Sequence, residues 1–239
     1  MPDHPDLARL RTEYADRARR LAGSDRYSPF NPAHRFALQQ RRWDTLDLLH
    51  RSGLRSLTGL RLLEIGCGAG GVLIEYLDHG VAPRDLHGVD LLPDRLSEAR
   101  RRLPAAPLAC ADGRRLPYPN AAFDLVLQYT AFSSILDDAV KSAVAAEMLR
   151  VLKPAGARRR GGVIVWYDFW LNPTNPQARG IRPAEIRRLF PGCTYTFRRI
   201  TLAPPIARRL VPRSRMLAVL LERLKIFNSH YVGIIRPFF

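Results

Sequence analysis

The feature that most constrains the fold is a glycine-rich turn between an apolar run and a helix-forming segment. The stretch LLEIGCGAGG, residues 62–71, begins with apolar residues and carries four glycines in its last six positions. Glycine has no Cβ, so such a turn lets the backbone approach a ligand closely. The N–H groups at the start of the next helix point at the same place. The pattern predicts a ligand-binding turn that opens an α/β fold.

Two glycine patterns overlap in this turn. Gly66, Gly68 and Gly71 fit G-x-G-x-x-G, which is typical of loops that bind a dinucleotide. Glu64 with Gly66, Gly68 and Gly70 fits E-x-G-x-G-x-G, a loop for a different nucleotide. A glycine motif alone is weak support for either ligand. The glycines therefore leave the ligand open.

The chain beyond the turn alternates between strand and helix patterns. Apolar runs typical of buried strands are expected at residues 61–65, 85–90, 106–112, 122–128, 162–169, 193–202 and 230–237. Helical patterns are expected between them at residues 71–80, 93–103, 137–152 and 182–190. Such alternation predicts a mostly parallel seven-stranded sheet with helices on both faces.

The two ends of the chain add helices to this core. Residues 4–22 read as a charged helix, and residues 33–53 form a second one after a break at residues 26–32. Residues 204–227 are helical but broken at Pro212, so a helical insertion precedes the last strand. We also expect one antiparallel strand at the sheet edge. We expect one domain over residues 1–239. Its parts are a helical cap, a core and a C-terminal substrate-side segment, residues 1–55, 56–170 and 171–239.

The acids near the turn distinguish between the two possible ligands. Glu64 lies in the first strand, where an anion repels a pyrophosphate but attracts a cationic ligand. Asp90 ends the second strand and can bind ribose hydroxyls in either case. Asp112 follows the third strand, where a carboxylate can accept from an exocyclic amine such as that of adenine. Glu64 and Asp112 favour the second pattern.

With ACADGRRLPYPNAAFDLVLQ and EMLRVLKPAG, these motifs resemble the class I S-adenosylmethionine-dependent methyltransferases over residues 61–170. The resemblance implies a Rossmann-like fold with S-adenosylmethionine as cofactor and S-adenosylhomocysteine as product. It implies that the glycine loop holds the methionine part, that Asp90 holds the ribose and that Asp112 holds the adenine. The cofactor-binding residues are then expected to be Glu64, Gly66, Cys67, Gly68, Gly70, Asp90, Leu91, Asp112, Gly113, Gln128, Tyr27 and Arg35. The last two belong to an N-terminal lid.

The sequence also departs from the family pattern. Residues 157–160, ARRR, are inserted before the fifth strand, and Ala155 replaces a usual glycine. The WYDF, NP and RGI elements after that point resemble a bacterial small-molecule subgroup.

Methyl transfer by in-line displacement needs a nucleophile held close to the methyl group, and proximity supplies much of the acceleration. The candidate bases after strands four and five are Tyr129, Tyr167 and Asp168. By strand alternation, only one of Tyr167 and Asp168 can face the site. His34 and His230 are interpreted as packing residues. The segment QYTAFSS after strand four carries no acid, so no metal is expected.

Charge is concentrated at the C-terminal end. The net charge is +16, and residues 158–239 hold sixteen of the 38 Lys and Arg but three of the 22 Asp and Glu. This balance fits an anionic membrane, an acidic substrate or nucleic acid. A solvated arginine surface is favoured over any single partner, and the absence of N/D-P-P-Y after strand four argues against nucleic-acid bases as acceptors.

Location and redox state follow from composition. No apolar run approaches the length of a membrane span, and the charged first residues are not a secretory signal. Cys67, Cys110 and Cys193 lack metal-site or disulfide spacing, so a cytoplasmic protein is expected. The oligomeric state stays open.

The sequence therefore predicts a methyltransferase that acts on a small-molecule acceptor, acidic or lipid-linked, through an oxygen nucleophile and without a metal. One alternative is an NAD-dependent oxidoreductase. The other is a module that binds a polyanion or a membrane and keeps a methyltransferase fold.

Overall fold

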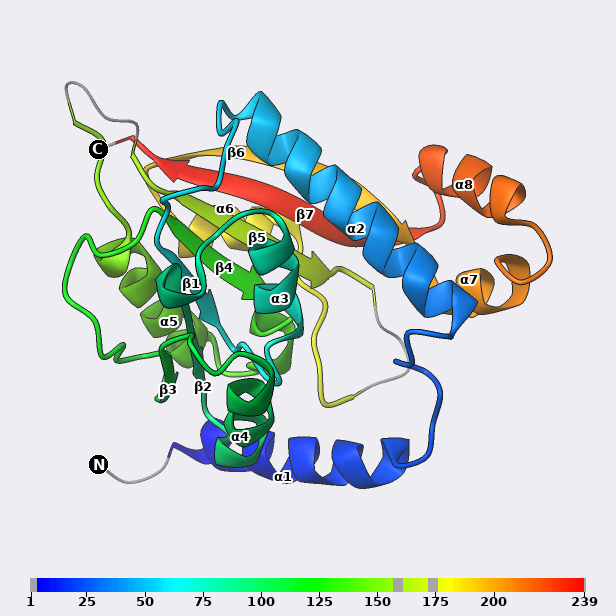
Figure 1. Ribbon diagram of the computed structural model, residues 1–239, viewed down its shortest axis with the longest axis horizontal. Coiled ribbons are helices and arrows are strands. Elements are labelled where there is room, and N and C mark those ends of the chain that lie inside the picture. The colour runs from blue at the N-terminus through cyan, green and yellow to red at the C-terminus, as the bar shows by residue number, and fades with distance from the viewer. Residues whose placement is uncertain (1–3, 157–160, 172–175, 239) are drawn as a thin grey trace.

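The computed structural model describes residues 4–156, 161–171 and 176–238 and places a twisted sheet between two layers of helices (Figure 1). The described residues form seven strands in the order β3-β2-β1-β4-β5-β7-β6. Their bounds are β1 Leu62–Ile65, β2 Leu86–Asp90, β3 Leu108–Cys110, β4 Leu125–Tyr129, β5 Val163–Phe169, β6 Cys193–Leu202 and β7 Asn228–Pro237. The expected fold class is confirmed, and the inserted residues 157–160 lie outside the described part of the chain.

Strand direction divides the sheet into two parts. Strands β1 to β5 pair in parallel, so their carboxyl ends meet at one edge. Strand β7 runs antiparallel to both β5 and the outermost strand β6. The expected antiparallel strand is therefore β7, and it joins β6 to the parallel core.

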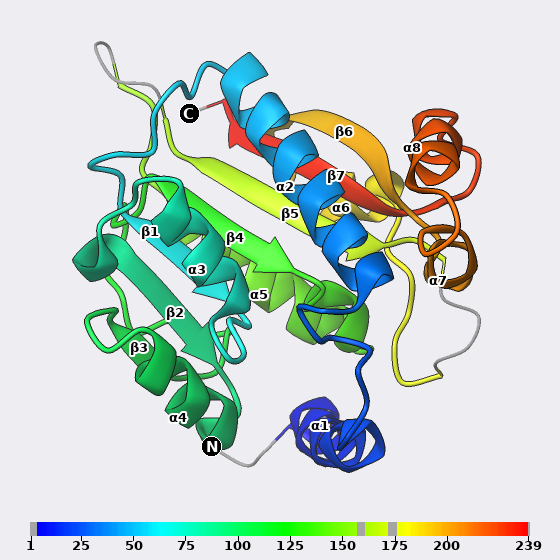
Figure 2. The same ribbon diagram turned by 45° about the vertical axis from the view of Figure 1, so that its right-hand side comes forward.

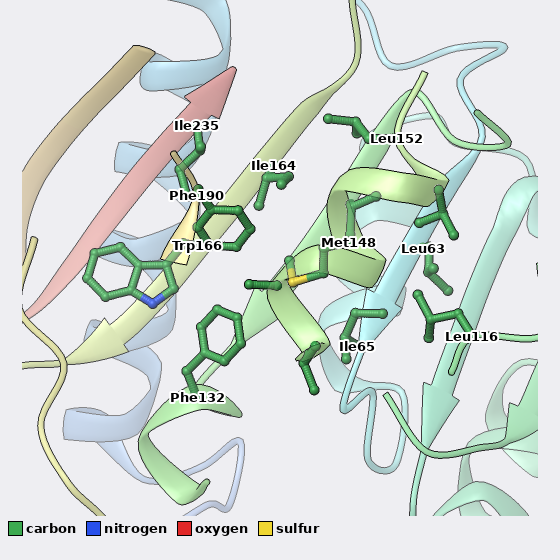
Figure 3. Close-up of a cluster of buried hydrophobic side chains, with 14 of the residues drawn as sticks. Leu63, Ile65, Leu116, Phe132, Met148, Leu152, Ile164, Trp166, Phe190 and Ile235 are labelled. Atoms are coloured by element: carbon green, nitrogen blue, oxygen red, sulfur yellow. The ribbon is translucent and has the colours of Figure 1, made fainter. Parts of the chain in front are cut away.

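Helices cover both faces of the sheet, as the alternating pattern predicts. On one face lie α2 Pro32–Arg51, α3 Gly71–Asp78 and α4 Pro93–Arg102. On the other face lie α5 Asp138–Val151 and α6 Pro183–Leu189. Figure 3 shows the core between the sheet and α5, where Met148 packs with Ile164, Trp166 and Phe132. Burial on both faces explains why the central strands β1, β4 and β5 are mostly apolar.

Helix α1, Pro5–Leu21, lies beyond the carboxyl ends of the central strands (Figure 2). Asp6 in its first turn accepts hydrogen bonds from the backbone N–H groups of Leu136 and Asp137, at 3.0 and 3.1 Å. The Tyr14 hydroxyl lies 3.2 Å from the Ser134 hydroxyl. The helix is thus held to the loop that follows β4, over the edge where the glycine turn lies.

The segment between β6 and β7 forms two short helices at one end of the molecule (Figure 1). These are α7 Pro204–Leu210 and α8 Arg215–Arg223, and Pro212 lies in the turn between them. Their inner faces pack on the first two turns of α2 through a small core of buried residues, Ala33, Phe36, Leu202, Ala207, Val211 and Ala218. No helix in the described part of the chain combines the length and apolar character that crossing a bilayer requires.

Candidate active site

A pocket of about 1170 Å³ opens at the carboxyl ends of β1, β2 and β4. Its walls are the glycine turn, the ends of these strands, the loop after β4 and the facing sides of α1, α2 and α3. The expected site residues that line it are Tyr27, Glu64, Gly66, Cys67, Asp90, Leu91, Asp112, Gly113 and Tyr129. The structure therefore brings together the three acids that the sequence places on three separate strands.

The glycine turn has a left-handed backbone that explains its composition. Gly66, Gly68 and Gly70 have φ angles of 74°, 54° and 75°, which side chains rarely adopt. The N–H groups of Gly66 and Cys67 donate to the carbonyl oxygen of Val89 at 2.8 and 3.0 Å. A Cβ at Gly68 would collide with the guanidinium of Arg95, which lies against the turn. Gly68 and Gly70 shape the turn from outside the pocket lining.

Asp90 ties the end of β2 to this turn. One of its carboxylate oxygens accepts from the Gly68 N–H at 2.7 Å, and the other accepts from the Leu92 N–H at 2.9 Å. Both oxygens keep lone pairs that can accept from a ligand hydroxyl. The carboxylate is thus fixed at the pocket wall before any ligand binds.

Asp112 lies in the loop after β3 and is held by its neighbour Arg114. The Arg114 backbone N–H and Nε donate to its two oxygens at 2.9 and 2.8 Å. Burial raises the pKa of Asp112, but the hydrogen bonds from Arg114 outweigh it and hold that pKa below its usual value. Asp112 therefore faces the pocket as an ionised acceptor at neutral pH.

Glu64 is buried, and one of its carboxylate oxygens lacks a hydrogen-bond partner among the described residues. The side chain is 2% exposed, and the oxygen in question is Oε2. Burial raises the pKa of Glu64 well above its usual value, although Arg41 and Arg95 oppose the shift. A buried acceptor without a partner is costly. A ligand that brings a positive charge or a donor to this wall would remove that cost.

The wall formed by α2 was not identified from the sequence. His34, Leu38, Arg41 and Arg42 line the pocket at helical spacing, whereas the expected Arg35 is exposed and lies outside the lining. Arg41 forms an ion pair with Glu75 of α3, and its guanidinium lies 5.2 Å from the centroid of the Tyr129 ring. The i, i+4, i+7 spacing of residues 34, 38 and 41 is the signal that could have found this face.

The pocket also contains a histidine that is neutral at physiological pH. Burial, followed by the charge of Arg41, lowers the pKa of His34 below its usual value. Its ring packs edge-on against Tyr27, with centroids 5.6 Å apart. An unprotonated imidazole in a pocket wall can accept a proton. The expectation that His34 only packs is replaced by a placement in the pocket wall.

Of the three expected catalytic residues, Tyr129 lines the pocket. Its hydroxyl lies 3.2 Å from the Tyr76 hydroxyl, and burial raises the pKa of Tyr129 to about 12. A phenol with this pKa stays protonated at neutral pH, so it can donate a hydrogen bond.

Tyr167, Asp168 and Gln128 do not line the pocket, whereas Gln128 and one of Tyr167 and Asp168 were expected to face it. The Tyr167 hydroxyl lies 3.0 Å from that of Thr201 on β6, beneath α2. Asp168 points to the opposite face and accepts from the Ser133 N–H at 3.1 Å, and its burial raises its pKa to about 7. Gln128, Tyr167 and Asp168 are all buried, so these three side chains lie in the core and not in the pocket lining.

The described residues hold no group of three or more His, Cys, Asp or Glu side chains that could hold a metal ion. The three cysteines, Cys67, Cys110 and Cys193, are free thiols. Burial raises the pKa of the Cys67 thiol, so it is a small apolar filler in the turn.

Residues 62–156, which contain the glycine turn and all three acids, match the family model of a methyltransferase domain. This match and the fold support a class I S-adenosylmethionine-dependent methyltransferase. The family and the fold imply S-adenosylmethionine as the cofactor and S-adenosylhomocysteine as the product. The residues present fit this group, because Glu64, which has an unpartnered carboxylate oxygen, lines the pocket beside the glycine turn.

Curated relatives carry methyltransferase names and match only part of this chain. The phthiotriol/phenolphthiotriol dimycocerosates methyltransferase of Mycobacterium leprae is 33% identical over 120 residues, which are 46% of this chain and 41% of that protein. The malonyl-[acyl-carrier protein] O-methyltransferase of Enterobacter lignolyticus is 36% identical over 98 residues, 40% of this chain and 36% of that protein. The matches thus span less than half of either relative.

Solved structures share the fold of this methyltransferase at low identity. An S-adenosylmethionine-dependent methyltransferase from Mesorhizobium loti is 19% identical with a TM-score of 0.56, covering 82% of this chain and 97% of that one. A TehB-like methyltransferase from Corynebacterium glutamicum is 17% identical with a TM-score of 0.55, covering 96% and 98%. The [4+2]-cyclase SpnF also has a TM-score of 0.55, with 19% identity and coverage of 81% and 80%. The fold alone therefore does not define a reaction.

Proposed function

We propose that this protein transfers a methyl group from S-adenosylmethionine to an oxygen atom of a small-molecule acceptor. The observation that carries the proposal is the convergence of Glu64, Asp90 and Asp112 on one pocket beside the glycine turn. An unpartnered buried carboxylate at this wall suits a cationic donor better than a pyrophosphate. The same feature disfavours an NAD-dependent oxidoreductase.

We assign the cofactor contacts to residues already held in place. Asp90 would accept from the ribose hydroxyls, and Asp112 would accept from the adenine amine. Gly66, Cys67 and Leu91 would supply the backbone wall, and Glu64 would lie near the methionine part. S-adenosylmethionine supplies an electrophilic methyl group when it is bound. The chain contributes position and exclusion of water, which together account for much of such a rate enhancement.

The acceptor side of the pocket is proposed to lie under α1 and α2. His34 would take the proton from the acceptor hydroxyl or carboxyl group, because its lowered pKa keeps it neutral. Tyr129 would orient the acceptor as a hydrogen-bond donor, since its pKa of about 12 rules out a base at neutral pH. Tyr167 and Asp168 are proposed to act indirectly. Tyr167 packs beside Arg41, and Asp168 holds the loop after β4.

The acceptor is proposed to carry an apolar portion. Leu7, Leu10 and Leu21 of α1 line the pocket together with Ile135 and Val140. The relatives named above for phthiotriol dimycocerosates and malonyl-acyl-carrier protein support a lipid-linked molecule, and the second supports an oxygen nucleophile. The arginines in the lining, Arg11, Arg17, Arg41, Arg42, Arg95 and Arg102, also suit an acidic group.

We further propose that residues 1–239 work as one unit in the cytoplasm. Residues 1–55 would cap the pocket, residues 56–170 would hold the cofactor, and residues 171–239 would contribute to the substrate side. The free state of the three cysteines supports a reducing compartment. A bacterial role in small-molecule biosynthesis belongs to the same proposal.

The test compares two cofactors on the full chain. Calorimetric titration with S-adenosylhomocysteine should show binding that Asp112→Ala weakens, while Asp85→Ala at the opposite end of β2 should leave it unchanged. Labelled S-adenosylmethionine with a panel of hydroxyl and carboxyl acceptors should then give a labelled product. Binding of NADH without binding of S-adenosylhomocysteine would overturn the proposal.

A further inference from the structure

The outer face of α8 and the residues after it form an exposed apolar surface. Met216, Leu220 and Ile226 are 84%, 56% and 65% exposed, far more than large apolar side chains usually are in a folded domain. We call this the α8 surface, and it comprises Met216, Leu217, Leu220, Leu224, Ile226 and Phe227. Its helical members recur at i, i+4 and i, i+3 spacing, so they share one side of the helix.

The inner face of α8 is anchored, so the apolar side chains cannot turn inward. Ala218 is fully buried in the small core that also contains Ala33 and Phe36 of α2, and the Glu222 carboxylate accepts from the Thr201 N–H at 2.9 Å. The Asn228 side chain donates to the Glu222 carbonyl oxygen at 3.0 Å. The fold therefore holds the leucines in solvent by fixing the opposite side of the helix.

The segment that carries the α8 surface is rich in arginine. Five exposed arginines lie on α7, on α8 and in the turn between them: Arg208, Arg209, Arg213, Arg215 and Arg223. In the described part of the chain none of the five forms an ion pair, and the one acid of residues 204–227 is the buried Glu222. An apolar surface in a segment whose exposed charged residues are all basic is matched by anionic headgroups over acyl chains.

We propose that the α8 surface docks on an anionic lipid bilayer, with the leucines in the interfacial region and the arginines at the headgroups. A second copy of the chain fits less well, because two cationic surroundings would face each other in a symmetric pair. A nucleic acid would satisfy the arginines but leave six large apolar side chains in water. Of these occupants, the bilayer alone matches both the charge and the apolar area.

The helices that carry the α8 surface lie close to the His34 end of the pocket. Helices α7 and α8 pack on the first turns of α2, next to Ala33 and Phe36. His34 lies between these two residues and lines the pocket. Docking through α8 would therefore hold the His34 end of the pocket near the bilayer. The docking itself does not depend on the reaction proposed above.

The proposal is tested by flotation of the full chain with lipid vesicles. We expect binding to vesicles with about 30% phosphatidylglycerol in phosphatidylcholine and much weaker binding to pure phosphatidylcholine. The variant L217Q/L220Q/L224Q should lower the affinity by about tenfold or more, because three partly inserted side chains are lost. R208Q/R209Q/R223Q should lower it similarly and flatten its dependence on salt.

Matched controls keep this test interpretable. Trp43→Ser removes another apolar side chain, 74% exposed, from α2 outside the α8 surface and should leave vesicle binding unchanged. Circular dichroism should show that all variants fold, since the replaced side chains are exposed.

Three results would overturn the proposal. The first is no vesicle binding by the wild-type chain. The second is vesicle binding that the leucine variant retains in full, which would leave charge alone as its cause. The third is a dimer in sedimentation equilibrium that dissociates in the leucine variant, which would assign the surface to a second copy.

Discussion

The Asp90 carboxylate accepts a hydrogen bond from the Gly68 N–H at 2.7 Å, joining the end of β2 to the glycine turn. Two segments that lie 22 residues apart are thereby locked at one point of the pocket wall. The left-handed turn and Asp90, which we propose binds the ribose, therefore form one prearranged unit. Such preorganisation lowers the cost of ordering when a ligand binds.

Replacing Asp90 by Ala should weaken cofactor binding and destabilise the fold together. The Gly68 and Leu92 N–H groups would lose their acceptor, which costs about 1–3 kcal/mol for each group that stays buried. We expect the affinity for S-adenosylhomocysteine to fall about 100-fold, measured by calorimetric titration, and the urea midpoint to fall. Unchanged affinity in the folded variant would contradict the assignment of Asp90 to the ribose.

Replacing Asp6 by Ala should loosen α1 without unfolding the core. Asp6 is the acceptor for the Leu136 and Asp137 N–H groups, so its loss detaches the first turn of the helix from the loop after β4. We expect faster proteolysis within residues 5–21 and a higher KM for S-adenosylmethionine, with a nearly unchanged urea midpoint. The control is Asp16→Ala, which removes an exposed pair with Arg19 on the same helix.

The Asp6 anchor also has a pH dependence of known sign. Burial raises the pKa of Asp6, but the Asp137 N–H and Arg9 outweigh it, so the folded pKa lies below 3.8. The contribution is therefore complete above that ordinary value and is lost as the pH falls through the folded pKa. The proteolysis difference between wild type and Asp6→Ala should persist at pH 5 and 7. A difference that disappears between these values would rule out the carboxylate as the anchor.

The sequence predicted the fold and the cofactor end of the pocket because both depend on local patterns. The mostly parallel sheet, the glycine turn and the acids Glu64, Asp90 and Asp112 follow from alternation and from the positions of strand ends. The α2 wall depends on how a helix is rotated about its own axis, which is set by packing. Arg41 meets Glu75 across two helices, and no short-range pattern encodes that pair.

Strand alternation was right for β5, but it did not predict which side chains line the pocket. Tyr167 and Asp168 do face opposite sides of the sheet, yet neither lines the pocket. Whether a strand end borders the pocket or the core depends on what covers it. Here α2 covers one side and the loop after β4 covers the other, which no single-strand pattern shows.

Replacing His34 by Gln should abolish the fall of kcat at acidic pH. With its pKa lowered below 6.5, His34 should be neutral and active through pH 7, and kcat should fall as the pH drops through that lowered pKa. In the variant, kcat should be about 100-fold lower and independent of pH over that range. A variant that retains the same acidic limb would show that another group takes the proton.

Replacing Tyr129 by Phe should have a smaller effect with a different signature. The pKa of about 12 keeps the hydroxyl protonated, so its loss removes one neutral hydrogen bond to the acceptor. We expect kcat/KM to fall about tenfold or less, with the shape of the pH profile unchanged. A loss of a limb near neutral pH would instead assign the proton transfer to Tyr129.

Replacing Glu222 by Gln should stabilise the protein, and the gain should depend on pH. Burial raises the pKa of Glu222 to about 7, above the ordinary value of 4.5, because Oε2 lacks a hydrogen-bond partner among the described residues. The folded chain therefore binds a proton that the unfolded chain releases, so stability falls as the pH rises from 4.5 to about 7. Above that range the cost of burying the charged Glu222 stays constant.

Gln at position 222 keeps an oxygen for the Thr201 N–H and carries no charge to desolvate. Urea unfolding should show a gain of about 1–3 kcal/mol at pH 8 that vanishes near pH 4. Glu222→Ala, which loses the Thr201 bond, should be less stable than Glu222→Gln at every pH, and a gain for Gln that does not vary with pH would show that the charge is not its cause.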